Sequence, residues 1–239
     1  MPNVAVGIMC KTPAPGKSKT RLSPPLHPTE CASISACFIR DLAHTIDELV
    51  SAGGVTGYAV YTPVGSEATL RRLLPANFEL LSQVDGDFGA RLFYGVRGLL
   101  DAGHDGVILV NSDSPTLPLS ILRDAVDAVR SGDNVVLSRA ADGGFTLIGL
   151  SRPHRHLFED IVWSTSTVYQ RTRDRAAEIG IAVLDVPPWY DVDDAVSLRM
   201  LEDELAGYPP PFSKLNGADA PSTRRFLRER HAALVDPAA

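Results

Sequence analysis

Residues that could do chemistry are concentrated near the N-terminus, in the segment Lys11-Thr-Pro-Ala-Pro-Gly-Lys-Ser-Lys-Thr-Arg21. The segment holds three of the four lysines of a chain that otherwise relies on arginine for positive charge. Its prolines and glycine deny it a helix and stiffen it. Ammonium groups on a stiff loop suit phosphate oxygens, and an arginine adds a bidentate fork. The segment therefore predicts a nucleotide-phosphate site at Lys11, Gly16, Lys17, Lys19, Thr20 and Arg21, with a solvated basic loop as the alternative.

Two acidic segments could complete such a site. Asp113, in Asn-Ser-Asp-Ser-Pro, ends an apolar run and would point into the crevice at the carboxyl end of a strand. A carboxylate there could hold Mg²⁺ or Mn²⁺, which neutralises diphosphate charge, or could merely begin a turn. In the later segment Tyr-Asp-Val-Asp-Asp, Asp191 and Asp193 would point the same way from extended chain. Either could share the metal with Asp113, whereas Asp194 suits the N-cap of the following helix.

The turn Asp142-Gly143-Gly144 has little side-chain bulk, so a sugar or an acceptor could approach its backbone closely. Asp142 could then bind sugar hydroxyls or act as a base toward an acceptor hydroxyl. Because Asp-Gly is also the usual signal of a β-hairpin turn, a purely structural role is the alternative.

Two further segments begin predicted helices. In Gly-Asp-Phe-Gly, Asp87 is either the N-cap of its helix or, together with Arg91, a nucleotide contact. Trp163, Ser164 and Thr165 open the other helix, whose free N–H groups could bind a phosphate or a carboxylate of the substrate. Alternatively, Ser164 serves only as the N-cap of this helix.

These segments have to be positioned by an alternation of strands and helices. Apolar runs predict strands at residues 4–10, 55–62, 78–83, 106–111, 134–139, 145–150 and 181–186. Apolar residues at helical spacing predict helices at 29–52, 68–74, 117–130, 164–179 and 194–205, and one more after the turn at 85–89. Such alternation predicts an α/β fold with three α/β/α layers and a mostly parallel sheet. Residues 1–206 would form this domain, and residues 207–239 a tail with a linker and a short helix.

Bulk composition limits the classes of partner. The net charge of −6 argues against nucleic acid or an anionic membrane surface. Apolar runs stay well short of the roughly 20 residues of a membrane span, and no signal-peptide pattern opens the chain, so a cytoplasmic protein is expected. The three cysteines lack metal-site spacing and are expected as reduced thiols. A homo-oligomer stays open, with the arginine-rich tail as a candidate contact.

Six motifs in order resemble the DUF2064 family of GT-A-type glycosyltransferases. They are Lys-x-Pro-x-x-Gly-x-x-Lys-Thr-Arg-Leu (11–22), Gly-Asp-x-Gly-x-Arg (86–91), Ser-Asp-x-Pro (112–115), Asp-Gly-Gly-Phe (142–145), Trp-Ser-Thr-Ser (163–166) and Asp-Val-Asp (191–193). The resemblance implies a nucleotide-diphospho-sugar transferase fold, a nucleotide beside residues 11–21 and a divalent metal on Asp113. The run from Lys19 to Leu22 is also similar to one in phospholactate guanylyltransferases. The Ser-Asp-x-Pro and Asp-x-Asp elements are similar to those of molybdenum-cofactor nucleotidyltransferases.

The expected function is therefore a metal-dependent transferase, foremost a glycosyltransferase that uses an NDP-sugar and a small acceptor. Lys19 and Arg21 would stabilise the leaving nucleotide, and Asp113 and Asp142 would serve as the catalytic carboxylates. The alternative is a nucleotidyltransferase that grips an NTP and releases pyrophosphate. A regulatory protein that binds a nucleotide without turnover is the third hypothesis. The base, the sugar and the acceptor do not follow from the residues.

Overall fold

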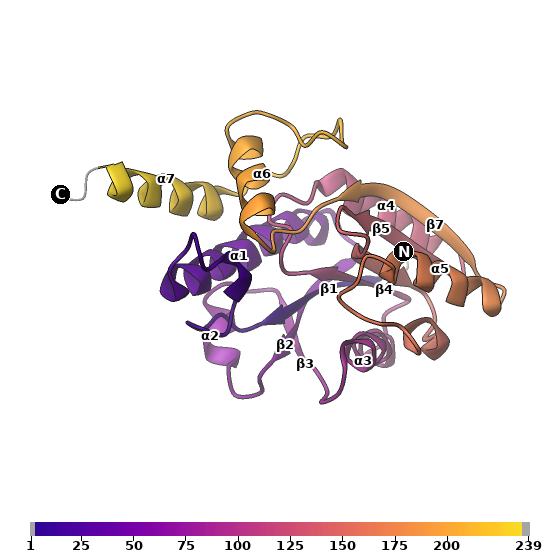
Figure 1. Ribbon diagram of the computed structural model, residues 1–239. Helices are drawn as coiled ribbons and strands as arrows, with labels where there is room; N and C mark the ends of the chain where they lie inside the picture. The colour runs from indigo at the N-terminus through magenta and orange to yellow at the C-terminus, as the bar shows by residue number, and fades with distance from the viewer. Residues whose placement is uncertain (1–2, 236–239) are drawn as a thin grey trace.

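The computed structural model describes residues 3–235 of the chain. A seven-stranded sheet runs through the molecule and helices cover both of its faces, as the layers of Figure 1 show. The strands are β1 (Val4–Lys11), β2 (Val55–Thr62), β3 (Glu79–Ser82), β4 (Gly106–Asn111), β5 (Asn134–Ala140), β6 (Phe145–Leu150) and β7 (Ala182–Trp189). The helices are α1 (Pro28–Ala52), α2 (Glu67–Arg71), α3 (Phe88–Asp101), α4 (Leu119–Arg130), α5 (Val168–Glu178), α6 (Ala195–Leu205) and α7 (Pro221–Val235), with 3₁₀ turns η1 (Thr20–Leu22) and η2 (Arg155–Phe158). The three-layer α/β/α prediction is confirmed.

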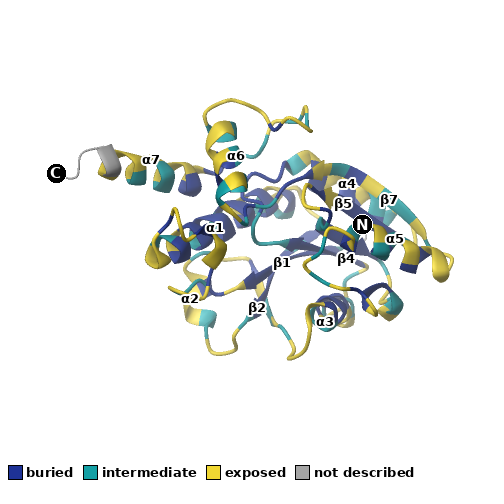
Figure 2. Ribbon diagram, viewed as in Figure 1, coloured by how far each residue is buried: buried dark blue, intermediate teal, exposed yellow. Residues whose placement is uncertain are grey.

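The apolar run of β1 explains the three layers. Val6, Ile8 and Cys10 pack toward α1, α2, α4 and α6, whereas Ala5 and Met9 pack toward α3 and α5. A strand that is covered on both faces must be apolar throughout, because successive side chains point to opposite sides. Figure 2 shows the result as dark blue central strands between helices that are dark blue on part of their surface only, whereas the edge strand β7 is largely teal and yellow.

The strand order β3-β2-β1-β4-β6-β5-β7 places β1 beside β4 at the centre. Chain order runs outward from β1 through β2 to β3 on one side, and β4 begins the other side. A reversal of this kind opens a crevice at the carboxyl ends of the two strands. Met9 pairs with Asn111 in this register, so the loop after Lys11 and the segment that contains Asp113 leave the sheet side by side.

The other two acidic segments reach the same edge. β6 runs antiparallel to its neighbours β4 and β5, so the turn with Asp142 lies at the carboxyl end of β5. β7 is parallel to β5 and also ends there, which brings Asp191 and Asp193 to that edge. Four segments that are distant in sequence thus converge because the strands before them share one direction.

Three predicted boundaries were wrong by three residues or more. α2 ends at Arg71 and not at residue 74. α5 begins at Val168 and not at residue 164, because Ser164 has a φ of +61° that no helix accommodates. The backbone of Ser166 instead packs against Gly143, and Tyr169 N–H donates to Gly143 O at 3.0 Å. β7 extends to Trp189 through two prolines, which an edge strand tolerates because one of its sides needs no ladder donors.

The part of the tail that the structure describes returns to the domain. The carboxylate of Asp41, which is buried on α1, accepts hydrogen bonds from the first N–H groups of α7, Ser222 at 2.9 Å and Thr223 at 2.7 Å. Arg230 pairs with Glu30 at 3.1 Å, and α7 then continues to the left of the body in Figure 1. Within residues 3–235, the helices are all too short or too polar to cross a bilayer.

Candidate active site

The loop after β1 turns one of its lysines inward. Lys17 N–H and Ser18 N–H both donate to Ala14 O, which folds the loop back on itself. Lys19 follows with φ +48° and ψ +41°, a left-handed conformation that is uncommon for a residue with a side chain. This conformation directs Lys19 away from its neighbours in the loop and toward the acidic segments.

Lys19 Nζ lies among three oxygens that belong to two different segments. Asp113 Oδ1 is 2.8 Å away, Asp193 Oδ1 is 2.7 Å away and Val192 O is 2.8 Å away. The lysine side chain is 7 % exposed, against 28 % for Asp113 and 44 % for Asp193. Burial lowers the pKa of Lys19, but the two carboxylates outweigh it, so the pKa lies above its ordinary value. Lys19 was predicted to bind phosphate, and in the structure its ammonium donors are directed at protein oxygens instead.

The other cations of the loop face an open cavity of about 340 Å³, which we call the cationic lobe. Lys11, Lys17 and Arg21 line it, together with Thr20 and Asp113. Within residues 3–235, Lys11, Lys17 and Arg21 make no ion pair with a carboxylate. Arg21 does act at longer range on Asp194, whose pKa it helps to lower. Three cations without an ion pair around one cavity attract an anion that carries several negative charges.

A second cavity of about 310 Å³, the acidic lobe, shares Asp113, Asp193, Arg21 and Ser164 with the cationic lobe. The two lobes therefore form one cleft. The remaining wall of the acidic lobe combines carboxylates with aromatic rings: Asp142, Asp191, Phe88, Phe145 and Trp163, with Gly144 and Thr165 beside them. Trp163 is held edge-on to Phe88 and Phe145, with ring centroids 5.1 Å and 6.3 Å away.

Asp191 shows how strongly negative the acidic lobe is. Burial, together with the nearby charges of Asp193, Asp142 and Asp113, raises its pKa to about 7, although Lys19 acts in the opposite direction. Lys19 compensates Asp113 and Asp193 and leaves Asp191 with neighbours of its own sign. A bound cation would relieve this repulsion.

A buried hydrogen-bond network holds the acidic segments together behind the cleft. Ser114 Oγ donates to Tyr190 O at 2.7 Å, and Val192 N–H donates to Asp113 O at 2.9 Å. Thr116 and Tyr190 both donate their hydroxyls to Glu204 on α6, Thr116 at 2.7 Å. Sequence reasoning missed this network. Its one signal is that Thr116 and Tyr190 adjoin the acidic motifs, whereas no sequence signal identifies Glu204.

Several predicted site residues have structural partners. Asp87 caps α3 by accepting the Ala90 N–H at 2.7 Å, and Arg91 Nε donates to Gly86 O at 3.0 Å, so neither lines the cleft. Asp194 caps α6, as predicted. Gly143 has φ +94°, and a Cβ there would lie 2.2 Å from Ser166 O.

Two predicted roles concern helix and loop backbone. Ser164 lines both lobes but does not open a helix, so the predicted anion site on helix N–H groups at residues 163–165 is corrected. Gly16 has φ +70° with open space around it, which fits its role in turning the cationic loop.

The donor chemistry of the acidic lobe fits a hard divalent cation, because Asp113, Asp191 and Asp193 offer carboxylate oxygens in a negative environment. Across residues 3–235, no three His, Cys, Asp or Glu side chains are already gathered as metal ligands. The Lys19 ammonium between Asp113 and Asp193 explains this, since it holds one oxygen of each. The metal site remains a prediction.

Comparison with known proteins agrees with the motifs. The sequence model of the family described as "uncharacterized protein conserved in bacteria (DUF2064)" matches residues 45–165, about half of the chain. The chain belongs to this family. The matched range of DUF2064 includes Asp113, Asp142 and Trp163, whereas the cationic loop and Asp191 lie outside it. No curated protein matches the chain in sequence.

Among solved structures, a protein from Desulfovibrio desulfuricans G20 has the same fold with a TM-score of 0.82 and 26 % identity, over 99 % of this chain and 98 % of that one. Its assignment as a nucleotide-diphospho-sugar transferase is provisional. Glucosyl-3-phosphoglycerate synthase from Mycobacterium tuberculosis, solved with Mn²⁺, UDP and glucosyl-3-phosphoglycerate, has a TM-score of 0.50 at 13 % identity over 86 % of this chain and 77 % of that one.

CMP:2-keto-3-deoxy-manno-octonic acid synthetase, solved with CTP, has a TM-score of 0.52 at 12 % identity over 85 % of this chain and 98 % of that one. At such identities these last two likenesses show the fold alone. The fold thus belongs to glycosyl and nucleotidyl transferases alike, and the choice between them depends on the site.

Proposed function

We propose that the protein is a metal-dependent glycosyltransferase that uses an NDP-sugar donor. The observation that carries the proposal is the pairing of two unlike lobes in one cleft. The cationic lobe offers Lys11, Lys17 and Arg21, which form no ion pair with a carboxylate among the described residues, and this arrangement suits a diphosphate. The acidic lobe beyond Asp113 offers carboxylates and aromatic rings, which suit the hydroxyls and the apolar C–H face of a sugar.

In this assignment each group has one task. Lys17 and Arg21 bind the diphosphate and stabilise the negative charge that grows on the leaving nucleotide. Lys19 acts from behind as a positioning residue that fixes Asp113 and Asp193. Asp113 and Asp191 would hold Mg²⁺ or Mn²⁺, which supplies further charge neutralisation to the diphosphate.

Sugar transfer forms a bond from the acceptor oxygen to the anomeric carbon and breaks the bond from that carbon to the diphosphate. The acceptor hydroxyl must lose its proton to a base. Asp142 is the candidate, because it lines the acidic lobe at the tip of the β5–β6 hairpin. Its Oδ1 accepts the Gly144 N–H at 2.8 Å, which fixes the direction of the carboxylate. Gly144, Trp163, Ser164 and Thr165 would line the sugar.

One observation favours nucleotidyl transfer as the second candidate. Three cations that form no ion pair within residues 3–235 could also compensate a triphosphate. An acceptor would then attack the α-phosphate and release pyrophosphate. The two reactions differ in their product, since glycosyl transfer releases a nucleoside diphosphate. The small phosphorylated acceptor of the second reaction would also have to enter a lobe that repels anions, which favours the first.

Thermal stabilisation by nucleoside di- and triphosphates and NDP-sugars, with and without Mg²⁺ or Mn²⁺, tests the proposal because a ligand of the native state raises the melting temperature. We expect one NDP and its sugar to give the largest metal-dependent shift. Lys17→Met should reduce the shift, and Asp113→Ala should abolish its metal-dependent part. A larger shift with an NTP, with release of pyrophosphate, would support the second candidate.

The third hypothesis, a regulator without turnover, predicts binding that survives Asp113→Ala. No shift with any of these compounds would contradict the proposed function as a whole.

A further inference from the structure

A third cavity, of about 410 Å³, lies on the α3 side of Trp163 and is separate from the two lobes of the cleft. We call it the outer cavity. The N-terminal half of α3 forms one side of it, and η2 with the segment up to Trp163 forms the other. Trp163 lines both the outer cavity and the acidic lobe. The two spaces therefore adjoin at Trp163.

Trp163 and Phe158 pack closely against Gly89 at the start of α3. A Cβ at Gly89 would lie 2.4 Å from Phe158 O and 2.9 Å from Trp163 Nε1, so only glycine lets the loop pack on α3 here. This packing accounts for the second glycine of the Gly-Asp-x-Gly motif. It places Trp163 where the two cavities adjoin and leaves it half-buried.

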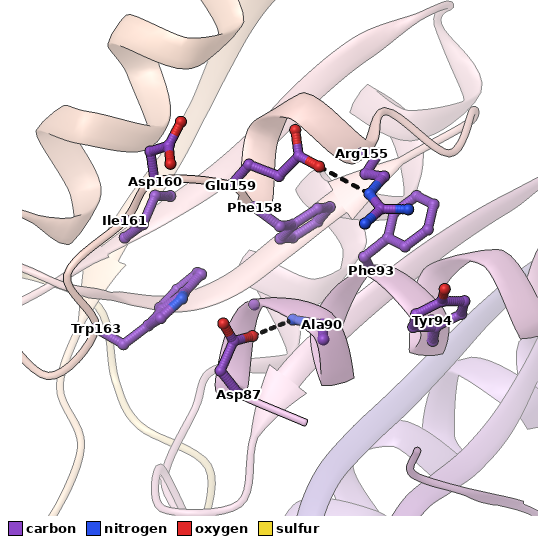
Figure 3. Close-up of a pocket in the computed structure, with 11 residues that line it drawn as sticks. Asp87, Ala90, Phe93, Tyr94, Arg155, Phe158, Glu159, Asp160, Ile161 and Trp163 are labelled. Carbon is purple, nitrogen blue, oxygen red and sulfur yellow. Dashed lines mark hydrogen bonds and ion pairs between the residues drawn. The ribbon is translucent and has the colours of Figure 1, made fainter. Parts of the chain in front are cut away.

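The lining mixes apolar rings with unused polar groups. Figure 3 shows Trp163 and Tyr94 on opposite sides of the outer cavity with Phe158 between them. The indole N–H and the Tyr94 hydroxyl have no hydrogen-bond partner within residues 3–235, and Tyr94 is 39 % exposed. Asp87 uses one oxygen to cap α3, and its other oxygen accepts no hydrogen bond from residues 3–235. Donors, acceptors and apolar rings thus face one space.

The charges limit what this space can bind. Its lining carries three carboxylates, Asp87, Glu159 and Asp160, and one guanidinium, Arg155. Arg155 pairs with Glu159 at 2.7 Å, and Arg175 from α5 pairs with Asp160 at 2.8 Å, so Asp87 is the lining carboxylate without an ion pair within residues 3–235. Arg155 also lies over the Phe93 ring, 5.8 Å from its centroid. Because both arginines are already paired with carboxylates, the lining offers no free cation within residues 3–235 to a phosphate or a carboxylic acid, unlike the cationic lobe.

We propose that the outer cavity binds the remote part of a neutral saccharide acceptor, whose reacting end enters the acidic lobe on the other side of Trp163. The inference rests on the proposed glycosyl transfer. A sugar presents hydroxyls that both donate and accept, and C–H faces that pack on aromatic rings, which is the combination that the lining offers. Remote contacts of this kind hold the reacting hydroxyl in place, since binding energy away from the reaction centre contributes to orientation.

The test uses the fluorescence of the full-length protein. Trp163 is half-buried, whereas the only other tryptophan, Trp189, is 0 % exposed, so quenching by acrylamide reports Trp163. The probes are the neutral methyl glycosides of glucose, galactose and mannose, an uncharged disaccharide, and glucose 6-phosphate as the charged counterpart. We expect at least one neutral probe, the disaccharide foremost, to protect Trp163 at millimolar concentration.

The variant Tyr94→Ala changes the outer cavity but not the cleft, because Tyr94 lines neither lobe. We expect it to weaken protection by the neutral probe at least 10-fold and to leave nucleotide-induced stabilisation unchanged. The matched control is Tyr208→Ala, which removes an exposed tyrosine outside all three spaces and should change neither.

Three results would overturn the inference. They are no protection by any neutral probe up to about 50 mM, which corresponds to a binding free energy weaker than roughly −2 kcal/mol, stronger protection by glucose 6-phosphate, or equal protection in Tyr94→Ala. If nucleotides still stabilise the protein in these cases, the proposed function stands and only this inference fails. If glycosides bind but no nucleotide does, the proposed function fails, and the acceptor assignment fails with it.

Discussion

Replacing Lys19 by methionine removes the cation between Asp113 and Asp193 while keeping the length of the side chain. Removing one partner of a buried ion pair costs about 3–5 kcal/mol, because the other charge stays buried without compensation. Asp113 and Asp193 are 28 % and 44 % exposed, so water screens part of this penalty. We therefore expect Lys19→Met to lower the free energy of unfolding by about 2–4 kcal/mol, which is about 4–16 °C in melting temperature for a chain of this size.

Urea denaturation at pH 7.5 in EDTA measures this loss. The pKa of Lys19 lies above its ordinary value of 10.5 in the folded protein, so the stability that it contributes is fully present below pH 10.5 and is lost only as the pH rises through the folded pKa. Lys17→Met is the matched control, because Lys17 has no carboxylate partner within residues 3–235. It should change stability by less than about 0.5 kcal/mol and reduce nucleotide binding instead.

Divalent cations sharpen the comparison. Without Lys19, Asp113 and Asp193 are free to share a cation with Asp191, so millimolar Mg²⁺ should stabilise Lys19→Met more than the wild-type protein. The reasoning is refuted if Lys19→Met and Lys17→Met are equally stable, or if Lys19→Met loses nucleotide binding with no loss of stability. The second result would return Lys19 to the phosphate role that the sequence suggested.

Three further predictions concern other parts of the site. In EDTA at pH 8, Asp191→Asn should stabilise the protein by about 1–2 kcal/mol after screening, and at pH 4 it should not, because a pKa raised from 3.8 to about 7 costs stability as the pH rises through that window. Gly143→Ala should cost about 2 kcal/mol more than Gly53→Ala in thermal unfolding, since both have φ near +90° but only Gly143 meets a backbone oxygen. Thr116→Val should cost about 1–3 kcal/mol in urea denaturation, because it removes one of the two hydroxyl donors to the half-buried Glu204 and the acceptor of the buried Trp189 indole N–H; a loss below about 0.5 kcal/mol would contradict the network.

The fold could be predicted because its signals are local. A run such as residues 4–10 is apolar throughout because both faces of β1 are covered, and Gly53 ends α1 where the predicted helix ends. The start of α5 could not be predicted. Ser164 and Ser166 follow the needs of a distant partner, Gly143, and nothing in the spacing of apolar residues encodes that contact.

The sequence predicts which residues belong to the site better than it predicts the contacts among them. The edge of the sheet gathers Asp113, Asp142 and Asp191 because parallel strands end together, and this follows from strand order. Which oxygen each cation meets depends on single backbone angles, such as the left-handed conformation of Lys19, which residue types do not reveal. Glu204 is the extreme case, since its part in the network depends wholly on where α6 packs.

The division of labour among the cations follows from elementary electrostatics. Three acidic segments that converge at one edge would repel one another. Lys19, whose side chain is 7 % exposed, compensates part of this negative charge, because its apolar stem packs against the protein while its ammonium contacts two carboxylates. The remaining cations of the loop form no ion pair in the part of the chain that the structure describes, and they face the cavity. A loop rich in lysine can thus both neutralise the carboxylates of an acidic site and bind the phosphates of its ligand. Mutation of Lys19, which is turned inward, should therefore lower stability. Mutation of Lys17, which faces the cavity, should lower the affinity for the ligand.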